Sequence, residues 1–217
     1  MAKKETELVE IRPIETRECT VRIIGDTPII VHAWSEKAKR QMLEAQMGNK
    51  KGAKKEPKNP VSDFIQSLYW LTPIPAEMTE SAFEKAIKGG ARFGFPATAV
   101  KQATISAAYR SGWTKDKVSL RGAFFILGDE SGMLEIHSDP PVMREDMVKI
   151  GMGTADIRYR GEFRNWYIDM TVSYNKNGNY DFPSILNMIN AGGYLCGIGE
   201  WRPEKDGTNG MYHVATE

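Results

Sequence analysis

The chain has 217 residues, of which 41% are hydrophobic and 26% charged, a composition typical of a globular protein rather than a disordered or fibrous one. Its 29 Lys and Arg residues nearly balance its 28 Asp and Glu residues, so the net charge of +1 gives no global argument for a polyanionic partner. No apolar run approaches the roughly 20 residues of a membrane-spanning helix, and the charged start lacks the apolar stretch of a signal peptide. We therefore expect one cytoplasmic domain over residues 1–217, with no membrane contact and with Cys19 and Cys196 reduced.

The N-terminal part predicts an arm, two strands, a helix and a loop. Residues 1–17 are polar and predict a flexible arm, whereas residues 19–24 and 28–34 are rich in β-branched side chains and predict strands. Ser35 can cap a helix that runs to about residue 47. Residues 48–60 then hold five lysines, a single acid and no apolar residue larger than alanine. Such a segment cannot bury enough surface to order itself, so it predicts a mobile basic loop.

Residues 61–115 predict a helical insertion. Apolar residues at helical spacing indicate helices over residues 61–71 and 79–88, and Pro96 suits the first turn of a third helix that runs to about residue 110. Small residues dominate the third helix, so we expect it to pack close to a sheet.

From residue 118 onward the pattern favours strands, over residues 118–127, 133–137, 142–150 and a long pair within 156–174. Over residues 166–174 large apolar and mostly polar residues alternate, which predicts that one face of this strand is buried. Asp181 and Pro183 begin a helix that Gly192 is expected to end, and a last strand follows the glycine-rich segment. The order of strand, helices, strands, helix and strand predicts an α+β fold. A strand followed by a helix occurs in each half of the chain, and this repeated order predicts a ferredoxin-like (RRM-like) antiparallel sheet core.

The sequence lacks the common motifs of metal and cofactor chemistry. Its three histidines have no metal-ligand spacing, and there is no phosphate loop, serine elbow or dinucleotide fingerprint. We therefore expect no metal, no cofactor and no catalysis. Two alternatives stay open: a metal-independent endoribonuclease that uses His32 with Asp26 or His137 as acid and base, and a structural assembly protein that binds no nucleic acid.

Basic and aromatic residues form the better candidate site. Arg158, Arg160 and Arg164 share one parity of a predicted strand, which would place three guanidinium groups on one face. Glycines around Trp201 let the backbone approach a ligand closely. Cations bind phosphates and rings stack on bases, as sequence-tolerant single-strand binding requires. The residues expected to bind nucleic acid are Lys50, Lys51, Lys54, Lys55, Arg92, Trp113, Arg158, Arg160, Arg164, Gly197, Gly199, Trp201, Arg202 and Lys205.

Three segments share features with one protein family. Residues 27–32 form an apolar strand end led by Pro28, residues 94–103 contain the helix start at Pro96, and residues 197–210 form a glycine-rich loop before the last strand. Together they resemble the RAMP superfamily, the ferredoxin-like RNA-binding proteins that form the backbone of CRISPR effector complexes. The resemblance implies that side-by-side protomers hold the backbone of a single strand, with residues 50–58 as a thumb-like insertion.

We therefore expect an oligomerising protein that binds single-stranded RNA or DNA without catalysis. Its partners would be further copies of itself, in a homo-oligomer or filament, and other subunits of the same complex. A CRISPR-type assembly subunit and a phage or mobile-element strand-annealing protein both fit this description.

Overall fold

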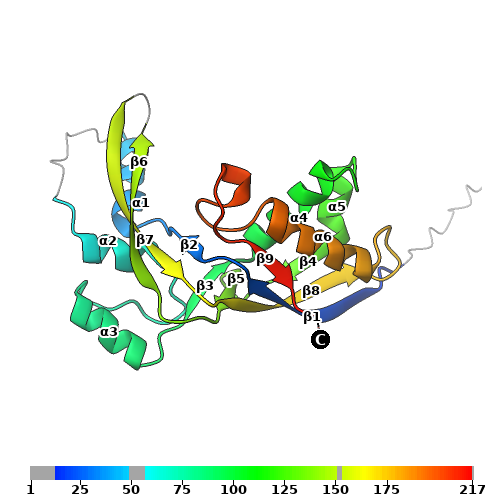
Figure 1. Ribbon diagram of the computed structural model, residues 1–217, viewed down its shortest axis with the longest axis horizontal. Helices are drawn as coiled ribbons and strands as arrows, with labels where there is room; N and C mark the ends of the chain where they lie inside the picture. The colour runs from blue at the N-terminus through cyan, green and yellow to red at the C-terminus, as the bar shows by residue number, and fades with distance from the viewer. Residues whose placement is uncertain (1–12, 49–56, 151–152, 217) are drawn as a thin grey trace, which may run out of the picture.

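The computed structural model describes residues 13–48, 57–150 and 153–216. The described residues form antiparallel sheets and α-helices, and the strands and helices come in runs along the chain, which confirms the expected α+β class. A central sheet carries helices above it, and a long hairpin rises away from the sheet at one end (Figure 1).

The central sheet has the order β4 (Phe124–Leu127), β8 (Tyr167–Asn175), β1 (Thr16–Gly25) and β9 (Tyr212–Val214), and every neighbouring pair is antiparallel. β1 and β8 pair over nearly their whole length, with Val21 opposite Met170. Along β8 the side chains of Ile168, Met170 and Val172 are buried and those between them are not, which confirms the predicted alternation. β1 already begins at Thr16, inside the segment expected to be an arm.

Helices α4 (Ala97–Arg110) and α6 (Phe182–Leu195) pack against each other on the buried face of this sheet. α6 does not end at Gly192 as expected but continues to Leu195. Gly192 and Gly193 serve close packing instead. A Cβ on Gly193 would lie 1.9 Å from the Tyr212 carbonyl oxygen, and one on Gly192 would lie 3.0 Å from the Thr104 nitrogen.

The projecting hairpin consists of β6 (Val142–Ile150) and β7 (Thr154–Phe163). From here on we call this hairpin the arm, which is distinct from the N-terminal arm expected over residues 1–17. The short strand β2 (Ile29–Val31) pairs with the base of β7. Helix α2 (Pro60–Ser67) packs against β7 as well, where a Cβ on Gly161 would lie 2.2 Å from Leu68. α2 ends at Ser67 rather than at the expected residue 71, because Leu68 is extended and Trp70 forms a β-bridge to Phe93.

The remaining elements are short. β3 (Phe93–Pro96) pairs with β5 (Met133–Ile136), α1 (Glu36–Gln46) follows β2, α3 (Glu80–Lys88) precedes β3, and a 3-10 turn spans Pro203–Lys205. The strand expected from residue 118 is wrong over its first part, where α5 (Lys117–Ala123) forms. Asp116 explains the helix, because its carboxylate accepts hydrogen bonds from the backbone N–H groups of Val118 (2.8 Å) and Ser119 (3.1 Å).

Candidate functional site

Residues 196–211, which we call the glycine loop, fold back onto β2. Glu200 N–H donates to the Ile30 carbonyl over 2.8 Å, and Gly210 N–H donates to the Pro28 carbonyl over 2.8 Å. Gly199 has a φ of +84°, and a Cβ there would lie 2.5 Å from the Ile30 oxygen. Only glycine fits this close approach, so the segment is a fixed part of the fold rather than slack.

Trp201, in the middle of this loop, has a strained backbone. Its φ is +53°, a region that bulky L residues rarely adopt. The loop maintains this conformation, because Asn209 N–H donates to the Trp201 carbonyl over 3.0 Å. The backbone of Gly207 packs so closely against the same carbonyl that a Cβ on Gly207 would lie 1.7 Å from its oxygen. Strain of this kind persists only where the surrounding structure enforces it. The ring nevertheless remains 41% exposed.

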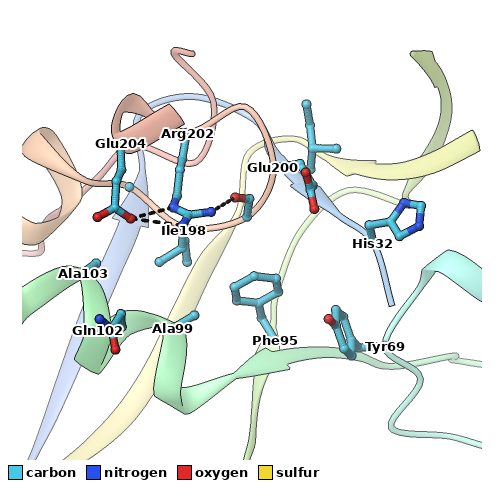
Figure 2. Close-up of a pocket in the computed structure, with 13 residues that line it drawn as sticks. His32, Tyr69, Phe95, Ala99, Gln102, Ala103, Ile198, Glu200, Arg202 and Glu204 are labelled. Atoms are coloured by element: carbon cyan, nitrogen blue, oxygen red, sulfur yellow. Dashed lines mark hydrogen bonds and ion pairs between the residues drawn. The ribbon is translucent and has the colours of Figure 1, made fainter. Parts of the chain in front are cut away.

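A pocket of about 190 Å³, the loop pocket, lies between the glycine loop, β2 and the first turns of α4. Tyr69 and Phe95 line one side, with their rings edge to face at 5.7 Å. Figure 2 shows the Glu200 carboxylate turned toward the space beside these rings and His32, whereas Arg202 is turned away toward Glu204. The pocket therefore combines an aromatic side with the Glu200 carboxylate and the His32 imidazole, and the paired Arg202 and Glu204 line it too.

A buried ion-pair network joins this pocket to the arm. Arg160 is only 2% exposed, and its guanidinium reaches Asp146 at 3.0 Å and Glu200 at 3.5 Å. Its Nε–H also donates to His32 Nδ1 over 3.3 Å. The network continues along the arm through three further pairs: Arg144 with Asp146 (2.9 Å), Arg144 with Glu162 (3.0 Å) and Arg164 with Glu162 (2.7 Å).

These contacts fix the charge states of the network. Burial lowers the pKa of His32, and the positive charge of Arg160 lowers it further, so the imidazole is neutral at pH 7. Burial alone would raise the pKa of Asp146, but hydrogen bonds from Arg144 and Arg160 lower it overall. Asp146 is therefore ionised, and it balances the buried guanidinium.

The three strand arginines do not share one open face as expected. Arg160 is buried, whereas Arg164 follows the end of β7 and is 63% exposed. Arg92 pairs with Glu135 at 3.2 Å, and Arg202 pairs with Glu204 at 3.0 Å. Among the predicted cations that the structure describes, Arg158 and Lys205 have no ion-pair partner within residues 13–48, 57–150 and 153–216.

The other predicted residues lie apart from the glycine loop or outside the described chain. Trp113 is 52% exposed and lines a larger hollow of about 790 Å³ beside α6, which we call the helical hollow. Lys50, Lys51, Lys54 and Lys55 lie outside the described residues. Lys58, at the end of that basic segment, contacts the Asp156 carboxylate and the Ile157 carbonyl on the arm.

The structure brings together different acid–base partners from those considered in the sequence. Asp26 contacts His213 at 2.6 Å, and His137 stacks on Tyr167 at 4.7 Å, while His32 faces Arg160. Sequence reasoning did not identify Tyr69 or Glu200 as site residues. Glu200 could have been found from its position between Gly199 and Trp201, two residues that were predicted to bind. Tyr69 had no such signal, because it reaches the pocket only through the packing of the segment after α2.

Comparison with known proteins gives no assignment, since the sequence matches no protein-family model and no curated protein. No three His, Cys, Asp or Glu side chains of the described residues gather as a metal site would require. None of the helices in the described part of the chain combines the length and apolar character needed to cross a bilayer. Function must therefore be argued from the glycine loop, the arm and the two hollows.

Proposed function

We propose that the protein binds single-stranded nucleic acid without catalysis and assembles with further copies of itself. The strained, exposed Trp201 carries the proposal. A backbone outlier that the fold maintains is a sign of function, and an indole held at the surface suits stacking on a base. Lys205 lies in the same loop, and Arg158 lies two residues along β7 from Arg160, which contacts Glu200. These cations are available to phosphates.

The strand order supports a ferredoxin-like core for this protein. Numbered along the chain, the strands of the central sheet are β1, β4, β8 and β9, and the order β9-β1-β8-β4 corresponds to 4-1-3-2. α4 lies between the first and second of them, and α6 lies between the third and fourth. We propose on this basis a βαββαβ core, to which β2, the arm and the pair of β3 with β5 are additions. Membership of the RAMP superfamily stays a proposal that this strand order favours.

Fluorescence anisotropy with fluorescein-labelled (dT)20 and (rU)20 tests strand binding and distinguishes DNA from RNA. If Arg158 and Lys205 each neutralise one phosphate, the log–log salt slope is about −1.4, and affinity falls roughly sevenfold between 50 and 200 mM salt. Loss of one stacked base in Trp201→Ala weakens binding about tenfold. Absence of binding at 50 mM salt would refute the proposal.

Two controls make this experiment specific. Trp113→Ala removes a second exposed tryptophan, 52% exposed against 41% for Trp201, that lines the helical hollow, and we expect less than a twofold change in affinity. A loss in Trp113→Ala without one in Trp201→Ala would place the stacking surface elsewhere. Gel analysis of the incubated RNA tests the endoribonuclease alternative, because cleavage that His32→Ala abolishes would favour it.

The exposed face of the arm supports assembly with a second copy. Met143, Met147 and Ile157 are 47%, 76% and 42% exposed, and the register places Met147 opposite Ile157 on one face. The helical hollow at the other end of the molecule is lined in part by Trp113, Tyr194 and Leu195, which are also exposed. An apolar projection and a hollow with exposed aromatic and aliphatic side chains on one chain fit a head-to-tail contact between copies, which produces rings or filaments.

Sedimentation velocity at increasing protein concentration tests this contact. Met147→Asp is expected to abolish self-association without lowering the melting temperature, because a side chain that is 76% exposed contributes little to the fold. Ile14→Asp is the matched control at an equally exposed apolar residue outside the arm. Oligomers that persist in Met147→Asp would contradict the head-to-tail contact, and oligomers indifferent to nuclease treatment would favour a purely structural assembly.

A further inference from the structure

The size of the loop pocket limits what it can hold. Its volume of about 190 Å³ is more than ten times the roughly 10–15 Å³ that a cavity needs to hold one water, and it is below the roughly 300–1,000 Å³ of sites for drug-sized ligands. The edge-to-face pair of Tyr69 and Phe95 lines one side, and a flat aromatic ligand packs well against such rings. The pocket therefore fits one ring system rather than a whole nucleotide.

The charges on the pocket wall disfavour a phosphate. The Arg202 guanidinium donates to the Glu204 carboxylate and to the Gly199 carbonyl, each over 3.0 Å. Glu204 also accepts from Arg110 over 2.8 Å, so two arginines already engage this carboxylate. Glu200 is different: its side chain is 44% exposed, and a single ion pair at 3.5 Å, to Arg160, is its charged contact within the described residues. Its carboxylate has acceptor capacity left for a ligand.

His32 supplies the complementary donor. Arg160 Nε–H donates to His32 Nδ1, and the lowered pKa keeps the ring neutral, so the remaining ring proton lies on Nε2. Glu200 thus brings two carboxylate acceptors to the wall and His32 brings one N–H donor, and the Gln102 amide and the Tyr69 hydroxyl lie on the same wall.

We propose that the loop pocket binds the Watson–Crick edge of a guanine base in the bound strand, an inference that rests on the proposed single-strand binding. Guanine N1–H and N2–H donate to the two Glu200 oxygens, and His32 Nε2–H donates to guanine O6. A carboxylate pairs best with two adjacent N–H donors. On their Watson–Crick edges adenine and cytosine have a single amino group, and thymine or uracil has one N–H between two carbonyls, so each of these bases matches Glu200 less well than guanine does. Trp201, next in the chain, stacks on a neighbouring base.

Anisotropy with fluorescein-labelled thymidine 12-mers that carry one central substitution tests this specificity, in DNA or the uridine equivalent, whichever binds more tightly. A central guanine is expected to bind about tenfold more tightly than a central adenine, since a bidentate contact discriminates by this order. Hypoxanthine, which lacks the N2 amino group, loses several-fold. 7-Deazaguanine binds like guanine, because N7 makes no contact.

Glu200→Gln is expected to bring the guanine-to-adenine affinity ratio to within twofold of one. Glu145→Gln, an exposed acid on the arm outside the pocket, retains the ratio. Equal affinities for guanine and adenine in the unaltered protein, or an unchanged ratio in Glu200→Gln, would overturn the inference alone, provided that all-thymidine or all-uridine strands bind. Failure of every strand to bind would instead overturn the proposed function as well.

Discussion

Gly199→Ala, compared with Gly90→Ala, tests whether the glycine loop is fixed against β2 as the structure describes. The two glycines have nearly the same backbone conformation, with φ of +84° and +82°. They differ in their surroundings. A Cβ on Gly199 would lie 2.5 Å from the Ile30 carbonyl oxygen, whereas a Cβ on Gly90 would have no atom within 4 Å.

The expected magnitudes follow from this difference. A left-handed conformation costs a non-glycine residue ~1–2 kcal/mol, and the less flexible unfolded chain returns ~0.4–1 kcal/mol, so Gly90→Ala should cost about 1 kcal/mol. Gly199→Ala also forces the loop away from β2. It then loses the Glu200 N–H bond to Ile30 and adds a packing shift, which brings the total cost to roughly 3 kcal/mol.

Thermal denaturation followed by circular dichroism measures both changes. One kcal/mol shifts the melting temperature of a chain of this size by about 2–4 °C, so we expect losses of roughly 2–4 °C for Gly90→Ala and roughly 6–12 °C for Gly199→Ala. Equal losses in the two variants would refute the close approach of the loop to β2. A larger loss of melting temperature in Gly90→Ala than in Gly199→Ala would also contradict the prediction, because Gly90 has open space beside it.

Two further predictions concern the buried network. The pKa of His32 is lower in the folded chain than its usual 6.5, so the unfolded chain takes up the proton first as the pH falls. The free energy of unfolding should therefore decrease as pH drops below about 6.5. Urea titrations at pH 7, 6 and 5 should show a smaller decrease in His32→Gln than in the unaltered protein. Arg160→Ala leaves Asp146 buried with one partner fewer and should cost about 3 kcal/mol, whereas Arg92→Ala breaks an exposed pair with Glu135 and should cost below ~1 kcal/mol in the same titrations. Equal costs for the two arginines would contradict the assigned burial.

Local signals in the sequence predicted most of the elements. Ser35 and Thr79 were followed by the expected helices, because a cap bonds to backbone only three residues away. The alternation along β8 marked its buried face for the same local reason. The errors came where a distant segment decides. α6 passes through Gly192 because Thr104 and Tyr212 lie against it, and neither contact is visible in the sequence around residue 192.

The candidate site was predicted less well than the fold. Strand parity placed Arg158, Arg160 and Arg164 on one face of the predicted strand, but it could not show whether that face is open. Arg160 is buried because β6 brings Asp146 and the glycine loop brings Glu200, from 14 and 40 residues away in the chain. Exposure of Trp201 was likewise unpredictable from composition, since its ring is held outward by a loop whose shape depends on contacts with β2.

The three residues of β2 explain how the arm and the glycine loop form one site. One edge of β2 pairs with β7, where Ile30 lies opposite Glu162, and the Ile30 carbonyl accepts the Glu200 N–H from the loop. Ile29, Ile30 and Val31 are fully buried, so neither neighbour can move without disturbing the core. Arg160 adds a second link between β7 and Glu200. A strand held at Trp201 and a second copy held at the arm would therefore contact two elements that β2 joins, so that binding at one would favour a fixed geometry at the other.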